Sequence, residues 1–344
     1  MSNSAICRNP PKIDPVLSAL TFFLCLTMIF AEACKKGDSI NGPPSDDTSK
    51  AVVLNRILLS VSDPSVRRGL QICSIDADGS GFRRITYPLD SISYLNAVWS
   101  PNARHWAVIW DYYDARHREY PRLSLADTVG NFITLVSDVC LSGSPLWSPD
   151  GAQIVFSVPA VYGGSSSQVY VASAQGGTPR PVTHFAGLST IDTSAFAVRW
   201  LSNNELLTIV DYDSADTKRW SGLFEMDLAG NLTRRLFEDP DKRLHWADTN
   251  GDLIICTYWR RGSITGLLSL HKADSTIQYI REELFYLQTK EGYGGPRFSP
   301  DGQQFAFCIN KESPSTSTIV VRGLASGNEQ VLLRSSSAYV SDWR

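Results

Sequence analysis

Aromatic rings and arginines cluster in three stretches of the sequence, and these residue types suit binding better than bond-breaking chemistry. The clusters consist of Tyr112, Tyr113 and Arg116, then Trp220, and then Tyr258, Trp259 and Arg260. Such side chains are enriched at binding hot spots, because large rigid rings bury much surface at little cost in entropy. We therefore predict that they bind a protein or peptide partner, with carbohydrate as another candidate ligand. The alternative is that they lie in solvated loops and only cover one end of the fold.

Catalytic residues are harder to find. The sequence has no His-Glu-x-x-His, nucleophile-elbow or P-loop motif, and its five histidines fall in separate segments without paired spacing. We therefore expect a protein without catalytic residues, cofactor or metal. The alternative is a carbohydrate-active enzyme, a lyase or a glycosidase, in which a histidine or two carboxylates converge on one face. The carboxylates that could do so are Asp111, Asp114, Asp211 and Asp213.

The overall charge disfavours nucleic acid as a partner. The 344 residues carry a formal net charge of −3, whereas proteins that bind nucleic acids present a basic face. Hydrophobic residues make up 43% of the chain, which is enough for a large buried core. Beyond the first fifty residues, the cysteines show neither metal-site spacing nor a dense disulfide pattern, so we expect all four to be free thiols: Cys73, Cys140, Cys256 and Cys308.

The start of the chain has the pattern of an export signal. Two basic residues precede an apolar run over residues 16–30, which is shorter than the about 20 residues that a membrane-spanning helix needs. Residues 31–33 then form a small-x-small cleavage pattern directly before Cys34. A small residue followed by cysteine after such a run resembles the lipobox of bacterial lipoproteins.

This resemblance implies that residues 1–33 are a signal peptide and that the Cys34 sulfur carries a diacylglycerol. Residues 34–50 are polar and rich in Pro, Gly and Ser, which is typical of a flexible tether. We therefore expect a lipoprotein of the bacterial cell envelope, in the outer membrane, whose partner is another envelope protein or a peptide. The alternatives are a secreted protein cut before Cys34 and an uncleaved membrane anchor. The folded domain is predicted to span residues 51–344.

The predicted domain repeats itself six times. Each period has an aromatic anchor, then Ser-Pro-Asp-Gly or a variant, and then a short apolar strand. Pro fixes φ and Gly accepts a positive φ, so the four residues predict a tight turn between two strands. Two further short strands follow in each period, and four strands per period of about 45 to 53 residues predict the blade of a β-propeller. The six anchors are Trp99, Trp147, Trp200, Trp246, Phe298 and Trp343.

The repeat also resembles a known family. Trp-Ser-Pro-Asp-Gly at 147–151 and Phe-Ser-Pro-Asp-Gly at 298–302, with the turns at 76–81 and 175–178, are similar to the repeat of TolB-like, WD-repeat-like propellers. The resemblance covers about residues 51–344 and implies an all-β, six-bladed β-propeller with four-stranded antiparallel blades. It implies no particular function, because this repeat serves many roles.

The two ends of the domain predict how the ring closes. Strands expected over 56–61, 70–75 and 82–86 have no anchor before them, while 338–344 is an anchor strand with nothing after it. The three N-terminal strands and the single C-terminal strand together would complete one four-stranded blade. We therefore predict that the C-terminal strand closes the first blade, which removes two exposed strand edges.

The residue before each anchor is predicted to face the central channel. Four of these residues are polar and come from blades that follow one another in the ring: Arg199, His245, Arg297 and Asp342. Fixed charges in a channel can orient an anionic or peptide ligand. The alternative is that these side chains only bond a neighbouring blade.

Overall fold

The computed structural model describes residues 55–63, 69–86, 92–113, 119–127, 132–137, 142–158, 166–184, 191–214, 219–260, 264–284, 291–312 and 315–344. The chain divides into two units, Met1–Thr48 and Ser49–Arg344, and every described residue belongs to the second. The predictions for Cys34, Asp114, Arg116 and Cys140 lie outside the described residues. In the part of the chain that the structure describes, no helix has the length and apolar character to cross a membrane.

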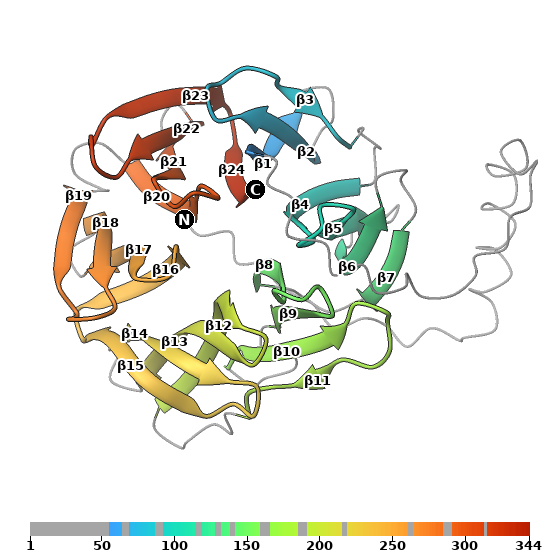
Figure 1. Ribbon diagram of the computed structural model, residues 1–344, viewed down its shortest axis with the longest axis horizontal. Coiled ribbons are helices and arrows are strands. Elements are labelled where there is room, and N and C mark those ends of the chain that lie inside the picture. Colours follow the sequence, from blue (N-terminus) through green and yellow to red (C-terminus); the bar gives the residue numbers. More distant parts are fainter. Residues whose placement is uncertain are drawn as a thin grey trace, which may run out of the picture. The chain divides into compact units, whose positions relative to one another are not determined.

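The described strands form six four-stranded antiparallel sheets, arranged as blades in a ring (Figure 1). From the centre outward, blade 1 consists of β24 (Ala338–Trp343), β1 (Arg56–Asp63), β2 (Gly69–Asp76) and β3 (Arg83–Arg84). Blade 2 consists of β4 (Ile92–Trp99), β5 (His105–Tyr113), β6 (Glu119–Asp127) and β7 (Phe132–Ser137). Blade 3 consists of β8 (Ser142–Trp147), β9 (Gln153–Val158), β10 (Gln168–Ser173) and β11 (Arg180–Pro181).

The other three blades have the same order of strands. Blade 4 consists of β12 (Ile191–Ser202), β13 (Glu205–Ser214), β14 (Arg219–Asp227) and β15 (Leu232–Asp239). Blade 5 consists of β16 (Lys242–Thr249), β17 (Leu253–Arg260), β18 (Ile264–His271) and β19 (Ile277–Leu284). Blade 6 consists of β20 (Glu291–Phe298), β21 (Gln304–Glu312), β22 (Ser315–Gly323) and β23 (Glu329–Ser335). The predicted six-bladed, all-β fold is therefore confirmed.

Blade 1 closes the ring as predicted, because its inner strand β24 comes from the other end of the domain. Strand β24 pairs antiparallel with β1, with Ile57 opposite Trp343. Arg56 and Arg344 exchange two backbone hydrogen bonds of 2.6 and 3.0 Å at the end of this pairing. The indole of Trp343 is 3% exposed and packs among residues of blades 1 and 6.

The Ser-Pro-Asp-Gly segments make tight turns for the expected reason. In blade 3, Ser148 Oγ donates to Asp150 Oδ1 at 2.6 Å and accepts from the backbone N–H of Gln153 at 2.9 Å. Gly151 takes a φ of +73°, which glycine adopts without steric cost. The same position in blade 2 is Ala103, at a φ of +54°. The turn geometry therefore persists where the glycine is missing.

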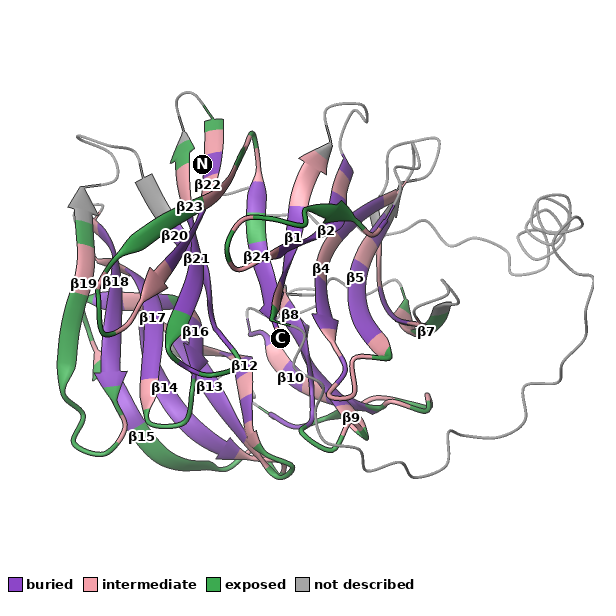
Figure 2. Ribbon diagram, turned by 45° about the horizontal axis from the view of Figure 1, so that its top comes forward, coloured by how far each residue is buried: buried purple, intermediate pink, exposed green. Residues whose placement is uncertain are grey.

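The core lies between the blades rather than inside any one of them. Clusters of buried side chains join neighbouring sheets: Trp147 of blade 3, for example, packs with Val98 and Ile109 of blade 2. Figure 2 shows the inner and middle strands as largely buried, whereas much of the outer strands β15, β19 and β23 is exposed. The prediction of no disulfide is confirmed for the described cysteines Cys73, Cys256 and Cys308, and burial raises the pKa of Cys308 to about 12.

Blade 5 differs from the sequence prediction in the position of its anchor. Strand β16 continues past the predicted anchor Trp246 to Thr249, and its register pairs Asp248 with Ile255. In blade 6 the equivalent pairing joins Arg297 to Ala306, one residue before the anchor. The residue before the anchor in blade 5 is therefore Asp248 and not His245.

The cause of this difference is a shorter turn after β16. Thr249 Oγ1 donates to the carbonyl of Leu253 at 2.9 Å and accepts from the N–H of Gly251 at 3.0 Å, which closes the turn within a few residues. The prediction assumed that the turn of blade 5 was as long as Ser-Pro-Asp-Gly. Trp246, although aromatic, lies inside the strand.

Candidate functional site

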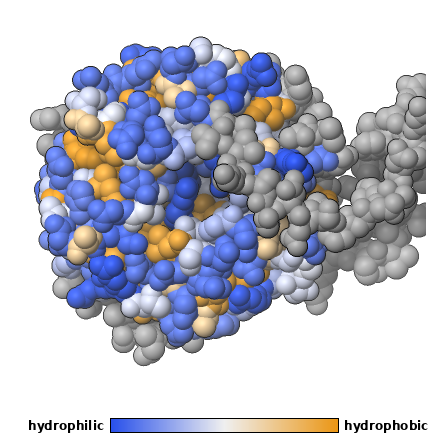
Figure 3. Space-filling view, viewed as in Figure 1, coloured by the Kyte–Doolittle hydropathy of each residue, from blue (hydrophilic) through white to orange (hydrophobic). Residues whose placement is uncertain are grey.

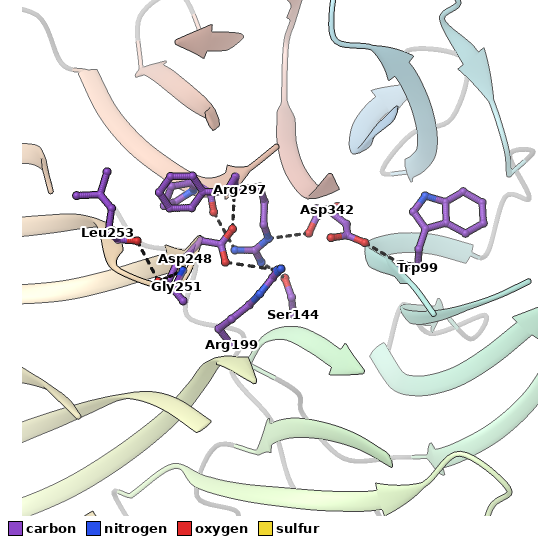
Figure 4. Close-up of polar contacts among 12 residues, drawn as sticks. Trp99, Ser144, Arg199, Asp248, Gly251, Leu253, Arg297 and Asp342 are labelled. Atoms are coloured by element: carbon purple, nitrogen blue, oxygen red, sulfur yellow. Dashed lines mark hydrogen bonds and ion pairs between the residues drawn. The ribbon is translucent and has the colours of Figure 1, made fainter. Parts of the chain in front are cut away.

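Four charged residues from four consecutive blades lie at the same level of the central channel, and we call them the charged tier: Arg199, Asp248, Arg297 and Asp342. Figure 4 shows their side chains converging between the inner strands. Three of them are the residues predicted from the sequence, and Asp248 takes the place expected for His245. The tier contains two positive and two negative charges, so its own net charge is zero.

Each of the two aspartates of the tier accepts a hydrogen bond from the next blade in the ring. Asp248 Oδ2 accepts a hydrogen bond of 2.8 Å from the backbone N–H of Phe298, the anchor of blade 6. Asp342 Oδ2 accepts the corresponding bond of 2.9 Å from the N–H of Trp99, the anchor of blade 2. Asp248 is fully buried. These contacts agree with the alternative that the tier bonds neighbouring blades, at least for its aspartates.

Arg199 links blade 4 to blade 5 through an ion pair. Its Nη1 lies 3.4 Å from Asp248 Oδ1, and the charge of Asp248 raises the pKa of Arg199. The Arg199 side chain is 37% exposed, because one side of it borders the open channel. Arg199 is therefore the member of the tier best placed to meet a ligand.

Arg297 reaches across the channel. Its Nε donates to the carbonyl of Ser341 at 3.0 Å, its Nη1 to the carbonyl of Pro296 at 3.0 Å, and its Nη2 to Ser144 Oγ of blade 3 at 3.2 Å. The residue is 3% exposed, and burial is the main cause that lowers the pKa of Arg297. The guanidinium thus connects blade 6 with blade 1 and with blade 3 on the far side of the channel.

A cavity lies at either end of the channel, and we name each after the face on which it opens. The loop face is the one where the second strand of each blade leads to the third, and the turn face is the one with the Ser-Pro-Asp-Gly turns. The loop-face cavity has a volume of about 200 Å³ and the turn-face cavity about 230 Å³. Leu146 and Arg297 line both cavities. Figure 3 shows the hollow at the ring centre, bordered mainly by hydrophilic residues.

The loop-face cavity holds a carboxylate that is fixed from both sides. Arg243 donates from Nε and Nη2 to Asp211 Oδ2 at 3.0 and 2.8 Å. Ser221 Oγ donates to Asp211 Oδ1 and accepts from the N–H of Leu244 at 3.0 Å. Such charge-assisted bonds are strong and directional, so blades 4 and 5 present these groups in one arrangement.

His245 lines the same cavity as a neutral side chain. The surrounding protein and the positive charge of Arg243 lower the pKa of His245 to about 4, while Asp211 opposes the shift. Its ring lies edge-on to Trp259 at a centroid distance of 5.9 Å. His245 was predicted to line the channel and does so, but nearer the loop face than the charged tier.

The predicted aromatic and basic cluster is only partly brought together. Trp220 stacks on Tyr212 at 5.2 Å and donates to Glu238 at 3.2 Å, on the outer part of blade 4. Arg260 pairs with Glu282 at 3.5 Å. Strand β5 includes Tyr112 and Tyr113, whose side chains lie outside the described residues. Trp259 of this cluster contacts His245, which lines the loop-face cavity.

Tyr258 differs from the prediction that placed it in an exposed loop. It is fully buried in strand β17, and its hydroxyl donates to Glu282 Oε2 at 2.6 Å. Burial raises the pKa of Tyr258. The β-strand extends to Arg260, so this ring belongs to the core between blades 4 and 5 and is not available to a partner.

The carboxylates proposed for a carbohydrate-active site are not gathered in one cavity within the described chain. Asp211 lines the loop-face cavity, whereas neither Asp111 nor Asp213 lines either cavity. Among the described residues, no group of three or more His, Cys, Asp and Glu side chains is arranged to hold a metal ion.

Comparison with known proteins identifies the fold. No model of a known protein family matches the chain, and no curated protein matches it. TolB from Acinetobacter baumannii is similar with a TM-score of 0.60 and 17% identity, over 84% of this chain and 67% of that one. A putative TolB from Agrobacterium tumefaciens has a TM-score of 0.55 and 16% identity, over 83% of this chain and 98% of that one.

Propellers of enzymes are similar as well. A puromycin-hydrolysing peptidase from Mycobacterium tuberculosis has a TM-score of 0.52 and 16% identity, over 81% of this chain. This chain covers 45% of that peptidase, less than half its length. The neighbours therefore include proteins with and without an enzymatic name. What these likenesses show is the fold: a six-bladed β-propeller structurally similar to those of TolB and of peptidases, at low sequence identity.

Proposed function

We propose that this propeller is a non-catalytic binding module of the bacterial cell envelope, held at the membrane through Cys34, that binds a peptide segment of an envelope protein in its loop-face cavity. The observation that carries the proposal is the cavity itself, which opens between blades 3, 4 and 5 and is lined by polar groups in fixed positions together with apolar side chains. The anchor and the cellular location rest on the sequence pattern around Cys34.

The lining of the cavity suits a peptide. Ligand sites are mostly apolar with a few well-placed polar groups, and here Phe196 and Leu244 provide apolar surface beside His245 and Arg243. A neutral imidazole both donates and accepts, so it can bond a peptide N–H or a carbonyl. Two arginines against one aspartate leave the described lining with a net positive charge, which favours a segment that carries an acidic side chain.

The same groups are poorly suited to acid–base catalysis. Both oxygens of the Asp211 carboxylate are already engaged by Arg243 and Ser221. A general base works best with a pKa near the operating pH, and the pKa of His245 lies at about 4. These features support binding over the alternative of a carbohydrate-active enzyme.

Photo-crosslinking in the native envelope tests the proposal. Phe196 lines the loop-face cavity, so a photoreactive benzoyl-phenylalanine at that position should crosslink the partner in intact cells. The matched control places the same residue at Ile133, which is 61% exposed on the outer strand of blade 2. Mass spectrometry should find an envelope-protein peptide joined to position 196 and absent from position 133. Equal products from both positions, or a product from position 133 alone, would contradict binding in the cavity.

A further inference from the structure

Two unlike sets of side chains line the turn-face cavity, and we call them its apolar wall and its cationic wall. One wall is built from the ring and proline side chains that follow the inner strands, among them Trp147, Trp200 and Pro149. The other wall carries the guanidinium groups of Arg199, Arg297 and Arg344. This cavity lies at the opposite end of the channel from the loop-face cavity.

The apolar wall is fixed by hydrogen bonds between blades. Trp147 Nε1 donates to the carbonyl of Val98 at 3.3 Å, and Trp200 Nε1 donates to the carbonyl of Leu146 at 3.0 Å. Each indole is thereby tied to the preceding blade, and its ring face cannot turn freely. A rigid aromatic surface binds a flat or branched apolar group at little cost in entropy.

The cationic wall has more basic than acidic side chains. Among the described residues that line the cavity, Asp342 is the one carboxylate beside three arginines. Asp248 pairs with Arg199 from within the wall, and its charge also acts on Arg297 together with that of Asp342. Burial is the main cause that lowers the pKa of Arg297 and of Arg344; the aspartates oppose this shift, and the positive charge of Arg199 adds to it.

The arginines also have hydrogen-bond donors to spare. A guanidinium carries five N–H groups. Within the described chain, Arg297 uses three contacts, Arg344 makes one side-chain bond of 3.4 Å to the carbonyl of Pro101, and Arg199 makes an ion pair but no hydrogen bond. None of the guanidinium nitrogens of these three arginines is buried without a partner, so their spare N–H groups can bond an added acceptor that carries negative charge.

We propose that the turn-face cavity is a second binding site, which takes a small organic carboxylate with an aromatic or branched apolar body. The planar fork of arginine matches the two oxygens of a carboxylate, while the indole and proline wall receives the apolar body. The volume of about 230 Å³ is below the about 300–1,000 Å³ of pockets for drug-sized ligands, so the occupant is the size of a single residue. Such a group is either a free carboxylic acid or the C-terminal residue of a peptide.

Calorimetry with defined ligands tests this proposal on the unmodified protein. N-acetyl-phenylalanine should bind, and its amide, which lacks the negative charge, should bind at least about tenfold more weakly. Affinity for the acid should fall as salt rises from about 50 to about 500 mM. The tetrapeptide Ala-Ala-Ala-Phe distinguishes the two sources: affinity above that of the acetylated residue indicates a peptide terminus, and equal or lower affinity indicates a free acid.

Two variants that each remove one positive charge locate the site. Arg344→Gln should weaken binding of N-acetyl-phenylalanine about tenfold, because one guanidinium of the wall is lost. Arg334→Gln removes an equal charge from the exposed outer strand β23 and should change affinity less than about twofold. The proposal is overturned if the amide binds as well as the acid, or if neither binds. Failure here would leave the crosslinking result at Phe196 untouched, since that cavity opens on the other face.

Discussion

The ion pair in the charged tier should make a measurable contribution to stability, and Asp248→Asn isolates it. The asparagine keeps an acceptor oxygen for the N–H of Phe298 but loses the charge that faces Arg199. Its amide would present donors to a guanidinium that also only donates. Asp342→Asn is the comparison variant, because Asp342 makes the same bond to the next blade and its charge acts on Arg297 and Arg344 without a close ion pair among the described residues.

The magnitude follows from the distance and the exposure of the two groups. At 3.4 Å the gross attraction is about 5 kcal/mol for an effective dielectric constant of about 20. The desolvation of the fully buried Asp248 opposes this attraction, and water in the channel screens Arg199. Exposed pairs contribute about 0–1 kcal/mol, and breaking a fully buried pair costs about 3–5 kcal/mol. We therefore expect about 1–2 kcal/mol here.

A double-mutant cycle in urea measures this coupling. The wild type, Asp248→Asn, Arg199→Gln and the double variant are unfolded under the same conditions, and the free energies of unfolding are compared. The coupling energy should be about 1–2 kcal/mol, and Asp248→Asn should cost more than Asp342→Asn. If the two single effects add to within about 0.3 kcal/mol, the ion pair does not couple blades 4 and 5 and the reasoning fails.

Four further outcomes are expected. Removing residues 338–344 deletes Trp343, whose loss alone costs about 3–5 kcal/mol of a total of about 5–15 kcal/mol, so the melting temperature should drop sharply; an unchanged melting curve would contradict closure by β24. The folded pKa of His245, about 4, lies below its ordinary 6.5, so stability should be lost as pH falls from 6.5 towards 4. His245→Asn should flatten that part of the curve, and an NMR titration midpoint near 6.5 would contradict the shift. Trp259→Ala should keep the melting temperature within a few degrees but weaken partner capture at least about tenfold, because this ring contacts His245 of the loop-face cavity; unfolding would instead place the ring in the core. Cys34→Ala should release the protein from membranes and abolish lipid labelling, and a wild type without lipid label would refute the anchor.

The number of blades and the closure could be predicted because both are encoded locally. A Ser-Pro-Asp-Gly turn needs its own few residues, such as the Ser148 hydroxyl, the Asp150 carboxylate and the positive φ of Gly151. The local sequence of such a period therefore predicts its turn. The unmatched anchor strand at 338–343 then identifies the mixed blade.

The contacts across the channel could not be predicted, because no local pattern relates the partners. Arg297 of blade 6 donates to Ser144 Oγ of blade 3, and nothing in the sequence around Ser144 predicts this hydrogen bond. The place of Asp248 was missed because the turn after β16 is shorter than those of the other blades. The pairing of β16 with β17, which puts Asp248 opposite Ile255, identifies Asp248 as the residue before the anchor.

Tyr258 did have a sequence feature that could have placed it in the core. Its partner in the neighbouring strand is Gly266, and a Cβ on that glycine would lie 2.4 Å from Cζ of the tyrosine. The missing side chain leaves the space that the ring fills. A glycine inside the apolar run 264–268 is thus a sign that a large side chain lies opposite.

The pairing of β24 with β1 has a consequence for the order in which the chain can fold. Trp343 Nε1 donates to Asn55 Oδ1 at 3.3 Å although the two residues are 288 positions apart, so blade 1 depends on contacts between the two ends of the domain. Blades 2 to 6 each form from contiguous chain and can assemble in turn as the polypeptide emerges. Strand β1, the first of the domain to be made, must keep one edge unpaired until residues 338–343 arrive. Such late, non-local pairing is slow and leaves an edge open to other chains, so assembly of the ring is most exposed to aggregation just before its last strand docks.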